Sequence, residues 1–432
     1  MLASGALSFI LTCLAAAVCF GQKLSVGGAL LSGTALLLAL AGLQFVCRAG
    51  LQRRETAIIA SCWGLFGGIN AAFQLVALQK YGDYGVLESF IANHKTFPRW
   101  LSGTRLLSAI YSAVGATDSA FFVAVLGVCV LLGCTLIALH WSNYSLACCT
   151  AVLSPIYFMF LSGYSEYYPF IAGPLLLLLV WMVKNSEKRV SPLLLGLLCA
   201  AFASLYFGYF PLAVALVLLV GKQSTTDRLL GLAAFVLLVG LAIPILWPAG
   251  WQSFLTALSV EIDPSGMNII PSYRLHRWHS SFLFEPDFLL SPLHVAHKLY
   301  IFFFSGMATL LALAGVHWQT LNTTHGWMRD PTFKGLLLLA LMEIGYFLLA
   351  IPYFGPRRDI DLFFQTGVVL GFFFGHVIER SAPPNDLPKI RGRSLGLLLG
   401  SGLALIWFLL FLGIPRPSRG LLRLLLNGFS FN

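Results

Sequence analysis

The sequence predicts an all-α fold, a polytopic bundle of about 11–13 transmembrane helices. Composition is the first observation: 58% of the 432 residues are hydrophobic and only 10% are charged. A typical soluble domain has roughly 25% charged residues, so a soluble chain of this length would lack the polar surface to cover its core. The second observation is that the hydrophobic residues form long runs, with short polar segments between most of them.

A helix needs about 20 apolar residues to cross a membrane, and the hydrophobic runs reach or approach this length. Run 2–21 resembles a signal peptide, but it lacks a basic start and a second run follows directly, so we expect a retained span. Run 192–221 is too long for one span. Tyr206, Gly208, Tyr209 and Pro211 lie at its middle, which predicts two short helices. The remaining runs are 24–47, 57–78, 120–139, 146–161, 169–183, 229–247, 299–318, 335–351, 362–378 and 395–414.

The net charge is +10. In a soluble protein this excess would suggest nucleic acid. Here the basic residues are dispersed among hydrophobic segments, so we expect loop anchoring and anionic lipid head groups, and no nucleic-acid partner. They are denser in the short loops on the side that holds Arg48, Arg53 and Arg54. We therefore take that side as cytoplasmic, which leaves the two long loops, 79–119 and 248–298, on the outer side.

The first outer loop, 79–119, contains Asp83 about one turn beyond the span 57–78. A carboxylate at the membrane boundary is suited to act as a general base or a metal ligand. The segments 86–94 and 99–115 each have apolar residues on one helical face, with Leu106 opposed by Ser108 in the second. We expect two amphipathic helices lying in the membrane interface.

The second outer turn contains a single acid, Glu166, among three tyrosines. Tyrosines at a membrane interface are ordinary anchors. A carboxylate ringed by aromatic groups is also suited to bind a sugar or to act as a general base. The candidate substrate-binding tyrosines, including two in the split run, are Tyr164, Tyr167, Tyr168, Tyr206 and Tyr209.

The third outer turn places Arg357 and Arg358 against the positive-inside tendency. Guanidinium groups pair with phosphate in a bidentate manner, so an anionic ligand is one explanation. The other is pairing with Asp359 and Asp361 within the fold.

The second long loop, 248–298, contains His276 and His279 in the segment HRWH, and a similar pair in HVAH. This spacing is compatible with a metal, but neither pair is a recognised zinc signature. A divalent metal is therefore not favoured, and we expect these histidines to contact substrate in a covering loop. Inside the membrane, Asn70, Gln74 and Glu343 are polar. Glu343 is either functional or hydrogen-bonded within the bundle.

The order of these features resembles the GT-C superfamily of integral membrane glycosyltransferases, which includes protein O-mannosyltransferases and aminoarabinose transferases. The shared elements are Gly82-Asp83 in a long first outer loop, an acid in the next outer turn, a large late outer loop and outer arginines. The resemblance covers roughly 57–380, so 1–56 would be two additional spans and 381–432 a last span with a basic amphipathic tail. Many members have paired acids in the first loop, whereas here Tyr84 follows Asp83.

The resemblance implies a polyprenyl-phosphate-linked sugar donor, a glycan, lipid or protein acceptor, and inverting transfer at the outer face. It implies that Asp83 or Glu166 is the base and that Arg357 or Arg358 binds the donor phosphate. Cysteine-free outer loops and short connectors fit a bacterial inner membrane. Two alternatives remain: a transporter or flippase of an amphiphilic anion, with a polar path through Asn70, Gln74 and Glu343, and a polymerase or ligase of lipid-linked glycans.

Overall fold

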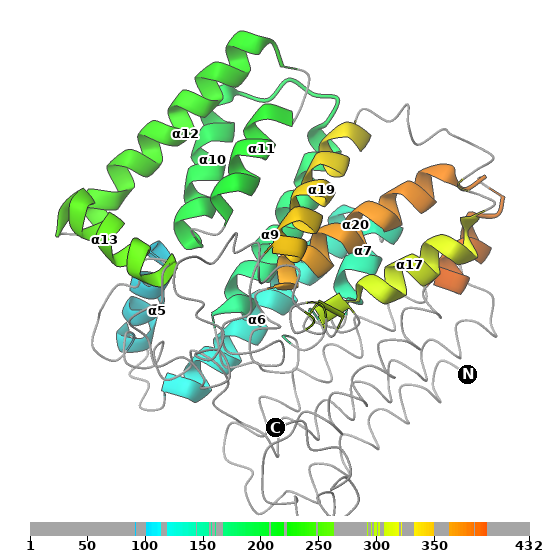
Figure 1. Ribbon diagram of the computed structural model, residues 1–432, viewed down its shortest axis with the longest axis horizontal. Coiled ribbons are helices and arrows are strands. Elements are labelled where there is room, and N and C mark those ends of the chain that lie inside the picture. The colour runs from blue at the N-terminus through cyan, green and yellow to red at the C-terminus, as the bar shows by residue number, and fades with distance from the viewer. Residues whose placement is uncertain are drawn as a thin grey trace, which may run out of the picture.

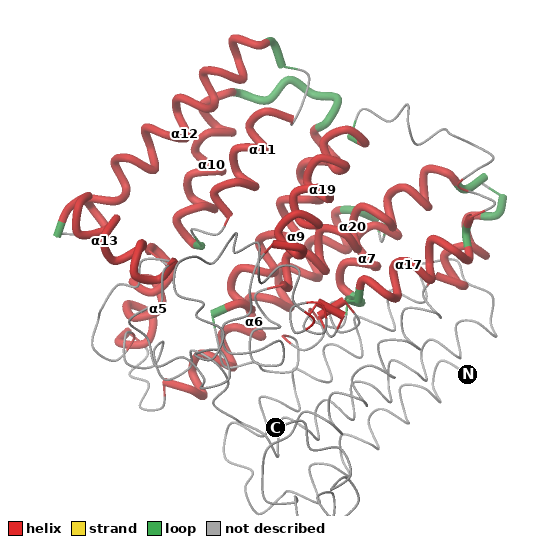
Figure 2. The backbone as a smooth tube through the Cα atoms, in the orientation of Figure 1, coloured by secondary structure: helices red, strands yellow, loops and turns green. Residues whose placement is uncertain are grey.

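The computed structural model describes helices between residues 91 and 394. All regular elements among the described residues are helical, as Figure 2 shows, so the all-α class is confirmed for this part of the chain. The described residues are 91, 101–113, 119–143, 145–154, 157, 160, 167–206, 209–219, 223–247, 249–262, 292, 295, 298–299, 301–302, 306–318, 321, 332–349, 363–383 and 385–394.

Figure 1 labels the described helices. In chain order they are α5 (Leu101–Ala113), α6 (Ser119–Trp141), α7 (Leu146–Val152), α9 (Tyr168–Asn185), α10 (Pro192–Leu205), α11 (Phe210–Leu219), α12 (Thr225–Leu246), α13 (Gly250–Ile262), α17 (Met307–Val316), α19 (Phe333–Leu349) and α20 (Phe364–Ser381).

Helices α10, α11 and α12 lie side by side (Figure 1). The long apolar run predicted to break does so: α10 ends at Leu205, Tyr206 has an extended backbone, and α11 begins at Phe210. Pro211 is the second residue of α11, where the missing N–H leaves no helical hydrogen bond unmade. The prediction of two helices in this run is confirmed.

Glycines allow α7 and α20 to approach each other closely. A Cβ at Gly375 would overlap the Thr150 side chain, and one at Gly371 would lie 3.0 Å from the Thr150 carbonyl oxygen. Gly371 and Gly375 are four residues apart and so share one face of α20, a spacing that lets helix backbones meet in membranes. Thr150 Oγ1 uses this proximity to donate to the Gly371 carbonyl at 2.5 Å.

Large apolar side chains point outward along α12. Leu230, Leu237 and Ile245 are 57%, 62% and 71% exposed, and their spacing places them on one helical face. A monomer in water rarely exposes so long an apolar stripe, whereas hydrocarbon solvates it well. Within the described residues, α9 and α12 are long and apolar enough to cross a bilayer. These features indicate that the protein associates with a membrane.

Three predicted segments differ from the helices observed. The run 146–161 contains α7, but that helix ends at Val152. Two residues later Ser154 precedes Pro155, and the residue before a proline disfavours helical backbone. The run 299–318 is interrupted at Gly306, which has φ +87°, and α17 begins after it. The loop 248–298 starts with a helix, α13. The sequence did not predict this helix, because the loop has a mixed composition.

Helix α5 matches the second predicted interface helix, 99–115, but its packed face is the small and polar one. Gly103, Thr104, Leu107 and Ser108 are buried, whereas Leu106 is 55% exposed.

Candidate functional site

The structure describes four of the predicted site residues, and these are Tyr167, Tyr168, Tyr206 and Tyr209. We call them the tyrosine cluster. The intramembrane pair Asn70 and Gln74 lies outside the described residues. So do the other predicted site residues, which are Asp83, Tyr164, Glu166, His276, His279, Arg357 and Arg358.

Tyrosines from two separate segments meet in the cluster. Tyr206 has ring-centroid distances of 6.2 Å to Tyr168 and 5.1 Å to Tyr209, both edge to face. This geometry places the positive edge of one ring against the negative face of another. The sequence grouped tyrosines of the turn before α9 with those of the break between α10 and α11 as candidates, and here rings of the two segments are in contact.

Phe364, the first residue of α20, adds a third segment to the cluster. Its ring centroid lies 5.6 Å from that of Tyr168 and 6.2 Å from that of Tyr209. Phe202 stacks on the other side of Tyr209 at 4.2 Å. Sequence reasoning missed Phe364, because one phenylalanine in an apolar run has no local signal that distinguishes it.

Tyr167 connects this cluster to α5. Its hydroxyl donates to the Leu205 carbonyl at 2.8 Å, and a Cβ at Gly103 would overlap its ring. Burial raises the pKa of Tyr167, so the hydroxyl keeps the proton that it donates. The Ser102 and Ser204 hydroxyls are also 3.1 Å apart. Helix α5, which belongs to the predicted first outer loop, is therefore held against the end of α10.

The tyrosine cluster is closed to solvent in this structure. All four side chains are buried, and the Tyr209 hydroxyl donates to the Ile171 carbonyl at 3.3 Å. The hydroxyls of Tyr167 and Tyr209 each donate to a backbone carbonyl and so fix helix ends relative to one another. Contact of these tyrosines with substrate stays a prediction.

Glu343 is hydrogen-bonded within the bundle, one of the two alternatives that its position left open. Gln365 Nε2 donates to its Oε1 at 2.9 Å, and Thr366 Oγ1 donates to its Oε2 at 3.0 Å. Both donors come from α20, directly after Phe364. The buried carboxyl group therefore fixes the position of α20 against α19, which carries Glu343.

Lys298 is a cation near the same helix ends that sequence reasoning did not single out. It is buried, and its Nζ lies 4.7 Å from the ring centroid of Phe363 and 5.3 Å from that of Phe347. An ammonium over aromatic faces is stabilised by the ring quadrupole. Burial lowers the pKa of Lys298 to about 7. Its position as the last residue of the loop 248–298 gave no sign of this burial.

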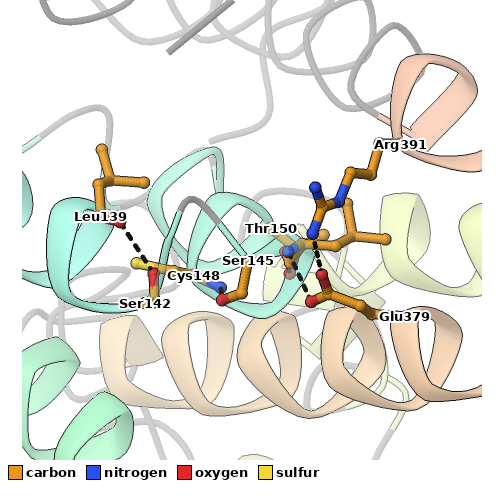
Figure 3. A network of polar contacts seen from close by, with 8 residues as sticks. Leu139, Ser142, Ser145, Cys148, Thr150, Glu379 and Arg391 are labelled. Carbon is orange, nitrogen blue, oxygen red and sulfur yellow. Dashed lines mark hydrogen bonds and ion pairs between the residues drawn. The ribbon is translucent and has the colours of Figure 1, made fainter. Parts of the chain in front are cut away.

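A second polar network lies where α7 begins and α20 ends (Figure 3). Glu379 Oε2 accepts from the backbone N–H of Leu146 at 2.8 Å, and Arg391 donates to Glu379 Oε1. The Ser145 hydroxyl caps α7 by accepting from the Cys148 N–H at 3.3 Å. These contacts tie together α7, α20 and the helical segment 387–394.

Metal ligands do not gather within the part of the chain that the structure describes. No group of three His, Cys, Asp or Glu side chains there is placed to hold a metal ion. The histidines of HRWH lie outside that part, so the structure does not place the pair His276 and His279.

No family model, no curated protein and no solved structure matches the chain.

Proposed function

We propose that this protein is a membrane glycosyltransferase of the GT-C type. It moves a sugar from a polyprenyl-phosphate-linked donor to an acceptor hydroxyl at the outer face of a bacterial inner membrane. The proposal includes a polytopic bundle of about 11–13 spans. The lipid-facing stripe of α12 and the 23-residue apolar helix α6 support that bundle.

One observation carries the proposal: a helix of the predicted first outer loop meets the segments that follow the second and third predicted outer turns. Tyr167 follows Glu166 in the sequence and packs over Gly103 in the first outer loop. Phe364, six residues after Arg358, contacts Tyr168. A catalytic base, a donor-phosphate site and an interface loop must be neighbours in such an enzyme, and these contacts support that arrangement.

The proposed reaction is a direct displacement. Asp83 or Glu166 takes the proton of the acceptor hydroxyl as its oxygen bonds to the anomeric carbon. The bond from that carbon to the phosphate oxygen breaks, and polyprenyl phosphate leaves with the bonding electrons. Arg357 or Arg358 stabilises the charge on the departing phosphate. Attack from the opposite face inverts the anomeric configuration, and no covalent enzyme intermediate forms.

The transporter alternative receives no support from Glu343. Both of its carboxyl oxygens accept hydrogen bonds from neighbouring side chains of α20. That arrangement joins two helices and does not by itself form a polar path.

Transfer assays in membranes containing the full chain test the proposal. A panel of polyprenyl-phosphate-linked hexoses and pentoses would be offered as donors to Asp83→Asn and Glu166→Gln variants. Loss of the base is expected to slow transfer about 100-fold or more in at least one of them. The matched control is Asp227→Asn, an acid that caps α12 at the opposite end. Full activity in both outer variants would overturn the assignment.

A further inference from the structure

A cavity of about 480 Å³ lies near the Glu379 network, at the end of the bundle away from the tyrosine cluster. Its lining includes Lys184 near the end of α9 and Arg380 near the end of α20. Lys184 is 16 residues after Tyr168, which corresponds to about 24 Å along the helix. In the proposed orientation this end faces the cytoplasm.

The charge around the cavity favours an anion. Lys184 and Arg380 both border it, and each has an exposed side chain. Glu379 borders it too, but its two carboxylate oxygens accept from Arg391 and from the Leu146 N–H. The lining therefore brings two cationic side chains, Lys184 and Arg380, to the cavity against the one acid Glu379.

The remaining lining suits an amphiphile. Val180, Val183 and Phe372 form an apolar part of the wall, and Ser145 adds a hydroxyl that can still donate while its oxygen caps α7. A volume of this size holds a lipid headgroup and the start of its chains. Basic pockets between membrane helices at the cytoplasmic side are suited to phosphate-bearing lipid headgroups.

We propose that this cavity binds a phosphate-bearing anionic headgroup supplied by the adjacent lipid leaflet, with Lys184 and Arg380 as its cationic contacts. The ligand is recognised as a phosphate by paired cations and as a lipid by the apolar wall. The site depends on membrane insertion and not on glycosyl transfer, so a protein inactive in transfer would still bind.

Thermal unfolding of the full chain in neutral detergent tests this proposal. The probes are dioctanoyl phosphatidylglycerol, dioctanoyl phosphatidylcholine and inorganic phosphate. Phosphatidylglycerol is expected to raise the melting temperature. Lys184→Gln and Arg380→Gln should each weaken its apparent affinity about fivefold. Lys188→Gln, which removes the same charge four residues away and outside the cavity lining, should leave the affinity unchanged.

Each outcome decides the proposal. If inorganic phosphate reproduces the stabilisation and the variant pattern, the phosphate site stands and its lipid source is wrong. Equal stabilisation of wild type and cavity variants, or no stabilisation by either anion, overturns the site. Lys184→Arg preserves the charge, so it should retain binding and provides a second test if Lys184→Gln does not fold.

Discussion

The ring of Tyr167 covers Gly103, so that two segments 64 residues apart share a contact that no larger side chain at position 103 would permit. The Tyr167 hydroxyl extends the contact to the Leu205 carbonyl at 2.8 Å. One side chain thereby joins the first predicted outer loop, the turn after Glu166 and the end of α10.

Gly103→Ala is expected to displace α5. The added methyl group would overlap the Tyr167 ring, and overpacking of this kind costs about 1–3 kcal/mol. We expect a lower melting temperature in detergent and slower sugar transfer. Gly133→Ala on α6 is the matched control, because its methyl group meets nothing within 4 Å and should stabilise the helix slightly. Equal melting temperatures for the two variants would contradict the packing described.

Glu343→Ala should weaken the junction of α19 and α20. It leaves the donors of Gln365 and Thr366 without their buried acceptor, and each such loss costs about 1–3 kcal/mol. Glu343→Gln keeps a carbonyl acceptor and should cost less. Leu341→Ala, on an exposed position of the same helix, measures the effect of truncation alone. The interpretation fails if chemical unfolding shows Glu343→Ala to be as stable as Leu341→Ala.

Lys298 predicts a pH dependence of stability. Its pKa is about 7 in the folded protein, against 10.5 for an ordinary lysine, because burial disfavours the charged form. Between these values the unfolded chain binds a proton that the folded chain does not, so stability rises with pH. The slope is at most about 1.4 kcal/mol per pH unit. Below pH 7 both states are protonated and the dependence disappears.

Melting curves of wild type and Lys298→Met from pH 7 to pH 10 measure this contribution. The stability of wild type relative to the variant should increase steadily across this range. A constant difference between the two proteins would mean that Lys298 is charged in the folded protein throughout.

The ion pair of Glu379 with Arg391 should be energetically coupled. Both side chains are largely buried, with 18% and 20% exposed, and the partners lie on α20 and the segment 387–394. A double-mutant cycle with Glu379→Ala and Arg391→Ala is expected to give about 0.5–3 kcal/mol. The exposed pair Asp386 and Lys389, 3.9 Å apart, supplies the control and should give less than about 0.5 kcal/mol. Similar coupling in both pairs would count against the role assigned to burial.

Much of the helical framework could be predicted from local pattern. The runs 120–139, 169–183 and 335–351 lie within two residues of α6, α9 and α19 at every end, because a continuous apolar run determines a helix without reference to its neighbours. The break near Tyr206 could also be predicted locally, because the run is too long for one span and has Gly208 and Pro211 at its middle. The interruptions at Val152 and Gly306 were missed, since apolar composition continues through both.

By itself the sequence determined the all-α class, the membrane-suited composition and a short set of polar residues. The tertiary structure alone decided which of these residues meet. It placed Phe364 among the tyrosines, Gln365 and Thr366 on Glu343, and both Lys184 and Arg380 in the lining of one cavity. The physical reason is that helix formation depends on nearby residues, whereas close contact depends on where two distant backbones can approach. Glycines such as Gly103 and Gly375 permit that approach, but their identity does not name the partner.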